Sequence, residues 1–259
     1  MKRIAVLITA LAVLGVAATS HAAINTYSAG ITTTTKQAGT ASKPVPTGYT
    51  ENLQVHGLNG NRAGVQLDIK TRIYGLVENG KDFPTCSLNQ IAYAHTDTIC
   101  PKGSKVATGS IAATLGAANN FQAVGASCNP QLDVFNSGQG KLTFFFVMTP
   151  AHQCLGGALT TGATGPYPAT YKQVGKYLEL DVPIPSYISY PVPGLVGSLE
   201  SEHLTFLKLT RQVHGKTVAA TSSIGCQGHT RPYSATFTST LPSSGSAKEI
   251  HTVSGSAGC

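Results

Sequence analysis

Apolar and polar residues alternate in several short stretches of this sequence, and a period of two is typical of β-strands. The clearest example is Val65–Lys70, which follows Gly64. A second stretch, Gln131–Phe135, is separated from Lys141–Met148 by the turn sequence NSGQG, so we expect these two stretches to form a β-hairpin. Because its second stretch is apolar on both faces, that strand should lie centrally in a sheet and be covered on both sides.

The second half of the chain carries further strand patterns around a proline-rich connection. Apolar and polar positions alternate from Val174 to Ile184, and Tyr187 and Tyr190 lie in the proline-rich segment Pro183–Gly197. Proline cannot donate a hydrogen bond within a sheet, so this segment should be an edge strand or a connection. The last residues, about sixty of them, are expected to form a meander of short strands.

Composition indicates the same fold class. Only 11% of the residues are charged, whereas exposed helix faces need many Glu, Lys and Arg residues. We therefore predict an all-β protein, a predominantly antiparallel two-sheet β-sandwich braced by disulfides, with one short helix. Residues 51–259 should form one domain of this kind; the alternative is two β lobes divided near residue 165. Residues 23–50, rich in Thr, Ser and Gly, should be a flexible lead or a loosely docked first strand.

The stretch Asp82–Ser110 is the most organised part of the sequence. It contains Cys86 and Cys100, each beside a proline, with a short apolar run between them. We expect a disulfide-closed lobe inserted between strands, with the rest of the chain packed around it. Within the lobe, Ser87 is placed to cap a short helix over Leu88–Ala94.

The N-terminus has the three parts of a secretory signal peptide. Lys2 and Arg3 are basic, Ile4–Val16 is almost wholly apolar, and Ser20-His21-Ala22 places small residues where a signal peptidase recognises them. The apolar stretch is short for a membrane span. We therefore expect residues 1–22 to be removed, no transmembrane anchor to remain, and the protein to be secreted, either free or associated with the cell wall.

Six cysteines follow the predicted signal peptide, and an even number in an exported chain indicates disulfides. Six cysteines allow fifteen pairings, which the sequence does not distinguish. The shortest loops would pair Cys86 with Cys100, Cys128 with Cys154, and Cys226 with Cys259. The second of these pairs also lies just outside the two strands of the predicted hairpin, where a bridge across its open end is plausible.

Charge and motifs disfavour several function classes. Without Lys2 and Arg3 the chain has 16 Lys and Arg against 11 Asp and Glu, with no basic cluster, so we expect no nucleic-acid binding. It contains no G-x-S-x-G or H-E-x-x-H motif, and we predict no cofactor, no metal site and no catalytic residues. Two close acidic pairs are interpreted as solvated strand positions: Glu179 with Asp181, and Glu200 with Glu202.

Two segments of the lobe carry a resemblance to a known group of proteins. The segments FPTCS (Phe83–Ser87) and CPKGSKVATGS (Cys100–Ser110), followed by the C-terminal cysteine pair, resemble a set of exported proteins of soil actinobacteria. The likeness is good over Asp82–Ser110 and loose over Cys226–Cys259, and the long proline-rich middle departs from it. Those proteins look like β-sandwiches of unknown function, so the resemblance implies compartment and architecture and carries over no functional residue.

These observations lead to one hypothesis and two alternatives. We expect an exported, non-catalytic extracellular or cell-envelope protein that binds a surface polymer or an envelope protein. The first alternative is a secreted hydrolase with a site assembled from distant residues. The second is a carrier of an apolar small molecule between the sheets, which would use Phe144, Phe146 and the loop of Tyr187 and Tyr190 as its ligand surface.

Overall fold

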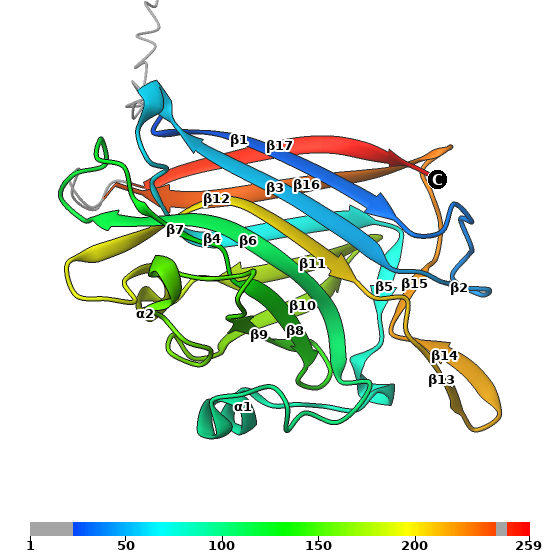
Figure 1. Cartoon of the computed structure of the whole chain (residues 1–259). Helices are drawn as coiled ribbons and strands as arrows, with labels where there is room; N and C mark the ends of the chain where they lie inside the picture. The colour runs from blue at the N-terminus through cyan, green and yellow to red at the C-terminus, as the bar shows by residue number, and fades with distance from the viewer. Residues whose placement is uncertain (1–22, 242–247) are drawn as a thin grey trace, which may run out of the picture.

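Strands make up most of the chain in the computed structural model, which describes residues 23–241 and 248–259 (Figure 1). The predicted signal peptide, residues 1–22, lies outside the described residues. The main sheet contains β1 (Asn25–Thr33), β3 (Tyr49–Gly57), β4 (Val65–Tyr74), β6 (Lys105–Ala117), β7 (Ala126–Cys128), β8 (Gln131–Asn136), β9 (Lys141–Val147), β10 (Tyr167–Val174), β11 (Tyr177–Pro183), β12 (Leu195–Phe206), β16 (Thr230–Thr240) and β17 (Lys248–Gly258). The other strands and the α-helices are β2 (Val45–Pro46), β5 (Leu76–Glu78), β13 (Thr210–Val213), β14 (Lys216–Ala219), β15 (Thr221–Ser223), α1 (Leu88–Ala94) and α2 (Ser186–Ser189).

The main sheet has the strand order β1-β3-β12-β6-β8-β9-β10-β11-β4-β16-β17, with β7 paired to β6. Paired strands are antiparallel throughout the described residues. The sheet curls until its two edges, β1 and β17, lie side by side (Figure 1). Tyr27 of β1 stacks on His251 of β17 with ring centroids 5.0 Å apart. The mostly antiparallel all-β prediction is therefore confirmed, but one nearly barrel-shaped sheet replaces the two stacked sheets that we expected.

The predicted hairpin is β8 and β9, which pair from Gln131 opposite Val147 to Asn136 opposite Leu142. Phe144 and Phe146 belong to the core inside the curled sheet, whereas Phe145 lies between them in sequence and faces outward into a separate cluster. Full burial of each ring stabilises the fold by about 1.5–3 kcal/mol. The expectation of a central strand covered on both faces is confirmed.

The disulfide-closed lobe covers the outer face of β8 and β9. Its helix α1 begins after Ser87, whose hydroxyl accepts a hydrogen bond from Gln90 N at 3.3 Å, while the Gln90 side chain accepts one from Ser87 N at 2.8 Å. This capping box satisfies two backbone N–H groups and explains why the predicted helix forms. The expectation that the rest of the chain packs around the lobe is wrong, because Ile91 packs with Phe145 on the outside of the sheet.

Residues 23–50 fit the expected flexible lead only in part. β1 pairs with β3 from Asn25 opposite Gly57 to Thr33 opposite Tyr49, and Ile31 is buried in the core, so the first half of this segment is an integral strand. Strands from either side of residue 165 are also neighbours, since β12 lies between β3 and β6 and β10 lies beside β9. A division into two lobes there would cut a continuous sheet.

The C-terminal strands depart from the predicted meander. β16 and β17 do form a pair, but β12 pairs with strands of the first half of the chain, and β13 and β14 form a small separate hairpin around His214. The proline-rich segment is a connection, as expected, and contains the short helix α2. None of the helices in the described part of the chain has the length and apolarity needed to cross a lipid bilayer.

The six cysteines form the three disulfides that the shortest loops favour. These are Cys86–Cys100, Cys128–Cys154 and Cys226–Cys259. Each closes a loop of moderate length and stabilises the fold by about 3–4 kcal/mol by restricting the unfolded chain. The second disulfide joins β7 to the loop between β9 and β10, so it fixes that loop against the sheet.

Candidate functional site: an apolar cavity with a buried carboxyl

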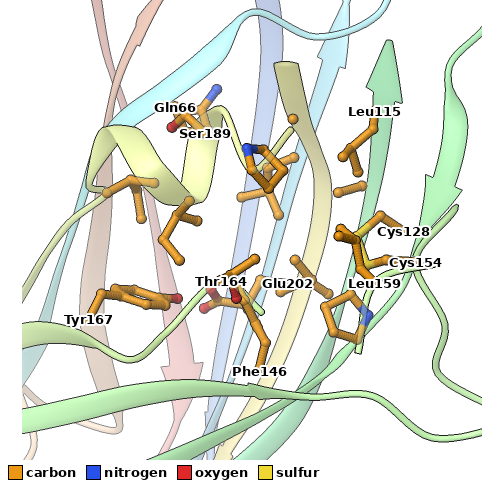
Figure 2. A pocket seen from close by; sticks show the side chains of 18 of the residues that line it. Gln66, Leu115, Cys128, Phe146, Cys154, Leu159, Thr164, Tyr167, Ser189 and Glu202 are labelled. Atoms are coloured by element: carbon orange, nitrogen blue, oxygen red, sulfur yellow. A yellow bond between two sulfur atoms is a disulfide. The ribbon is translucent and has the colours of Figure 1, made fainter. Parts of the chain in front are cut away.

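A cavity of about 80 Å³ lies inside the curled sheet (Figure 2). The inner faces of β4, β6, β9, β10 and β12 form its walls, and α2 and the loop between β9 and β10 complete the enclosure. Its lining is largely apolar and includes Ile111, Leu115, Phe146, Leu159, Ile188 and Leu199. An apolar cavity of this kind favours a ligand with substantial apolar surface.

Two segments outside the sheet complete the enclosure of the cavity, and each is tethered to the rest of the protein. Residues 148–165 are held at Cys154 by its disulfide to Cys128. The helix α2 is held by Tyr187, whose hydroxyl donates a hydrogen bond to Pro166 O at 2.9 Å, immediately before β10. Both tethers restrain the cover, so the cavity exists before any ligand enters, and this lowers the entropy that binding has to overcome.

Three polar side chains gather at one end of the cavity. Tyr167 is 3% exposed, its ring packs beside Phe144 and Phe146, and its hydroxyl points toward the region of Glu202 and Thr164 (Figure 2). Among the residues that the structure describes, none forms a hydrogen bond or ion pair with these three side chains. Their oxygen atoms are not among the fully buried atoms of the described chain that lack a partner, so they stay accessible and can hydrogen-bond a ligand in the cavity.

A β-bulge in β12 places Glu202 on the inner face of the sheet. Leu199 and Ser201 oppose consecutive residues of β6, which leaves Glu200 between them without an opposing residue. One extra residue shifts the alternation of side chains by one position. Leu199 and Glu202 therefore both face the cavity, although three positions separate them in sequence.

A second carboxyl lies close to Glu202 on the same face. Glu51 of β3 is 1% exposed and accepts a hydrogen bond from the Thr71 hydroxyl at 2.8 Å. Burial raises the pKa of Glu51 to about 7, an effect that the bond from Thr71 reduces. Burial, together with the charge of Glu51, raises the pKa of Glu202 to about 8. No Lys, Arg or His among the described residues lines the cavity, so no basic side chain there offsets the charge of Glu202.

The two acidic pairs noted in the sequence are not simply solvated. Glu179 is only 2% exposed and forms ion pairs with Arg72 at 2.6 Å and Lys172 at 3.1 Å on the outer face. Burial alone would raise its pKa, but the bonds from Arg72 and Lys172 bring the pKa of Glu179 below its ordinary value. Asp181 pairs with Lys70 at 3.1 Å and remains partly exposed. The solvated interpretation is therefore wrong for Glu179 and for the cavity-lining Glu202.

The candidate ligand surface from the sequence is adjacent to the cavity but differs from its lining. Phe146 lines the cavity, whereas Phe144 lies in the core behind it. Tyr187 and Tyr190 are exposed, and neither lines the cavity. Their neighbours Ile188, Ser189 and Pro191 do line the cavity, so the segment borders the site although its tyrosine side chains do not face it.

Sequence reasoning missed Glu51, Tyr167 and Glu202 as a group. The signal for Glu51 was present, because residues 49, 51, 53 and 55 share one strand face on which the other three are apolar. The signal for Glu202 was weaker. In LVGSLESEHLTF, the spacing from Leu199 to Leu204 breaks the period of two, and such a break is typical of a bulge.

A larger, more open groove of about 890 Å³ lies between β5, the β13–β14 hairpin and the loop before β2. Its buried acid is Glu78, which accepts a hydrogen bond from the Thr221 hydroxyl at 2.5 Å. Asp82, at the same groove, accepts one from Asn79 at 2.8 Å. Because these acidic groups already have partners within the protein, the interior cavity is the stronger candidate for a binding site.

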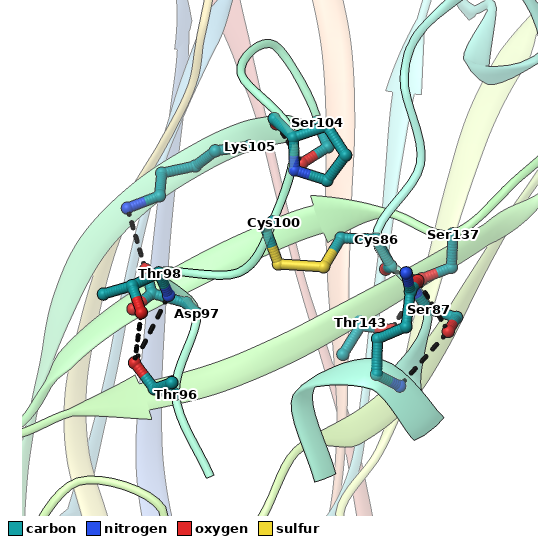
Figure 3. The surroundings of a disulfide bond; sticks show 12 residues. Cys86, Ser87, Thr96, Asp97, Thr98, Cys100, Ser104, Lys105, Ser137 and Thr143 are labelled. Atoms are coloured by element: carbon teal, nitrogen blue, oxygen red, sulfur yellow. Dashed lines mark hydrogen bonds and ion pairs between the residues drawn. A yellow bond between two sulfur atoms is a disulfide. The ribbon is translucent and has the colours of Figure 1, made fainter. Parts of the chain in front are cut away.

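The disulfide-closed lobe shows internal bonding rather than a ligand site (Figure 3). Lys105 forms ion pairs with Asp97 at 3.3 Å and Asp133 at 2.5 Å beside the Cys86–Cys100 disulfide. The described residues contain no cluster of three or more His, Cys, Asp or Glu suited to a metal ion.

No model of a known protein family matches this chain, and neither a curated protein nor a solved structure is detectably similar to it. The resemblance to exported actinobacterial proteins therefore stays a prediction. The cavity and its polar end are the features from which a function can be inferred.

Proposed function

We propose that the protein is an exported, non-catalytic carrier that binds a small, largely apolar molecule in the interior cavity. The observation that supports this proposal is an apolar cavity in which Tyr167 and Glu202 have no hydrogen-bonding partner within the described chain. Apolar walls with a few convergent polar groups are typical of small-molecule sites. This function corresponds to the carrier alternative, now with a different set of lining residues.

The size of the cavity limits the ligand. One water molecule needs roughly 10–15 Å³ of such a cavity, so about 80 Å³ has room for a handful of non-hydrogen atoms. Drug-sized ligands occupy pockets of about 300–1,000 Å³. The ligand is therefore about the size of one substituted ring or a short branched chain, or it inserts only one end of a longer molecule.

Export is part of the proposal, on the strength of the N-terminal sequence and the disulfides. The three disulfides are compatible with an oxidising environment outside the cytosol. Association with the cell wall, and binding to a surface polymer or an envelope protein, stay predictions. A hydrolase site of dispersed residues also stays a prediction, since the cavity supplies a reason for binding and not for turnover.

Binding of toluene, measured by isothermal titration calorimetry, tests the carrier function. Ala113 faces the cavity, whereas Ala112 precedes it on the same strand and faces the other side of the sheet. We expect the wild-type chain to bind toluene, Ala113→Phe to abolish binding by filling the cavity, and Ala112→Phe to preserve it. Absence of binding to the wild-type chain, or equal binding by Ala113→Phe, would show that the cavity is not a ligand site.

A further inference from the structure

The interior of the sheet carries acidic groups without a matching base. Glu202 of β12 lies opposite Leu53 of β3, and Glu51 of β3 lies opposite Leu204 of β12. The two carboxyls are therefore diagonal neighbours on one sheet face, close enough to repel each other when both are charged. Among the described residues, the neutral hydroxyl of Thr71 donates a hydrogen bond to Glu51, and it does not bond Glu202. A bound cation would offset the negative charge of these carboxyls, whereas a bound anion would add to their electrostatic repulsion.

The polar end of the cavity is also rich in unused hydrogen-bond acceptors. A carboxylate has about four lone-pair sites, and a tyrosine or threonine hydroxyl can accept as well as donate. Glu202, Tyr167 and Thr164 thus offer three acceptor groups that no described residue occupies. An alkylammonium group has three N–H donors and no acceptor. Its bonding requirement matches these three groups, whereas a carboxylate ligand could only accept and a neutral alcohol could donate only once.

We propose that the ligand is a small apolar amine whose ammonium group binds Glu202, Tyr167 and Thr164 while its apolar part fills the cavity. This proposal rests on the carrier function and adds the chemical class of the ligand. Glu202 supplies the opposite charge by releasing its proton when the ammonium group binds, and at the end of the apolar walls the resulting ion pair is screened little by water. Tyr167 is held in place by its packing against Phe144 and Phe146, with centroids 5.4 and 5.6 Å away. The binding groups are thus positioned before the ligand arrives.

Benzylamine and toluene form a matched pair of probes, because they share the aromatic ring and differ mainly in the amine. Titration calorimetry at neutral pH should show benzylamine binding the wild-type chain at least tenfold more tightly than toluene. Glu202→Gln should weaken benzylamine binding by about tenfold or more, a loss much larger than any change in toluene binding. The control is Glu200→Gln, which changes the acid at the bulge that does not line the cavity; it should bind both probes as the wild-type chain does.

The outcomes separate the two proposals. If toluene binds, but benzylamine binds no more tightly or loses nothing in Glu202→Gln, the carrier function stands and the amine assignment is wrong. If neither probe binds the wild-type chain, both proposals are wrong. Retained toluene binding shows that Glu202→Gln folds. Should that variant fail to fold, Tyr167→Phe provides the second test, with selective loss of benzylamine affinity expected and equal affinity contradicting the proposal.

Discussion

Arg62 is a buried guanidinium whose hydrogen bonds all go to uncharged acceptors. It donates to the backbone oxygens of Ala117 and Asn120 at 2.6 and 3.0 Å and also bonds Ala123, Val196 and Ser198. Desolvation lowers the pKa of the group, and the planar guanidinium presents five N–H donors, which suits several carbonyls at once. One side chain thereby joins the loop after β6 to the start of β12.

Replacing Arg62 with lysine should cost about 2–4 kcal/mol in the free energy of unfolding. Lysine keeps the charge but has only three donors, so buried carbonyl groups lose their partners. Urea denaturation measures the change. The matched control is Arg211→Lys, which alters an exposed arginine that donates to Asp82 O and should cost less than about 0.5 kcal/mol. Equal effects at the two positions would contradict the structural role of Arg62.

Several carboxyls bind protons more tightly in the folded state than in the unfolded chain. Burial raises the pKa of Glu51 to about 7 and those of Glu78 and Glu202 to about 8. Burial and the neighbouring Asp181 raise the pKa of Asp68 to about 6. The unfolded chain releases these protons near pH 4–5, whereas the folded protein holds them up to about pH 6–8. The free energy of unfolding therefore falls as the pH rises from about 4.5 to about 8.

The melting temperature should accordingly decrease between pH 5 and pH 9. Glu51→Gln removes one of the titrating groups and should reduce the decrease, whereas Glu200→Gln, at the bulge, should leave it unchanged. Circular dichroism during thermal unfolding measures all three proteins. A melting temperature that rises over this range, or the same decrease in the Glu51 variant, would contradict the assignment.

The bulge in β12 determines which side chains of that strand face inward. Before it, Leu199 faces the cavity; after it, Glu202, Leu204 and Phe206 face the interior. Deleting the bulge residue, Glu200, restores regular pairing and keeps all four side chains facing inward. Deleting His203 instead would turn Leu204 and Phe206 outward, because a shift of one residue exchanges the two faces of a strand.

We therefore expect the chain lacking Glu200 to fold and to lose less than about 2 kcal/mol of stability. The chain lacking His203 should fail to fold cooperatively, since two buried apolar side chains would face solvent. Urea denaturation followed by circular dichroism distinguishes the two. Similar stability of the two deletion variants would show that the bulge does not set the orientation of β12.

Features determined by near neighbours could be predicted from the sequence, and those determined by distant pairing could not. The α1 helix follows from Ser87 and Gln90 three residues apart, and the β8–β9 hairpin follows from its turn residues. The position of β12 depends on contacts with β6 across about 80–100 residues and with β3 across about 150, which no local pattern contains. Recognition of Glu202 as a site residue required both that position and the bulge at Glu200, so the cavity was not predictable as a site.

The number of strands along the main sheet determines how its two edge strands are oriented relative to each other. Counting along the eleven-strand path of the described residues, each strand runs opposite to the last, so β1 and β17 point the same way (Figure 1). No backbone ladder between these two edges is present in the described chain. Side chains join them instead, through Tyr27, which contacts His251 and donates to Glu249 at 2.9 Å.

Amide hydrogen exchange should reveal the seam, the line along which the edge strands β1 and β17 meet without a backbone ladder. Amides of β1 and β17 that point toward the seam should exchange about tenfold or more faster than those of β8 and β9, which have paired strands on both sides. Exchange measured residue by residue by NMR makes the comparison within one protein. Equal protection of the seam and of the β8–β9 hairpin would show that a backbone ladder closes the sheet.

The placement of β12 also governs when the protein can fold during its synthesis. β3 and β6 are translated well before β12, the strand that lies between them in the finished sheet. Until β12 emerges from the ribosome, both keep unpaired edges, and such edges associate readily with other chains. A nascent chain that has produced only its first half therefore cannot complete its sheet, and productive folding waits until most of the polypeptide has been made.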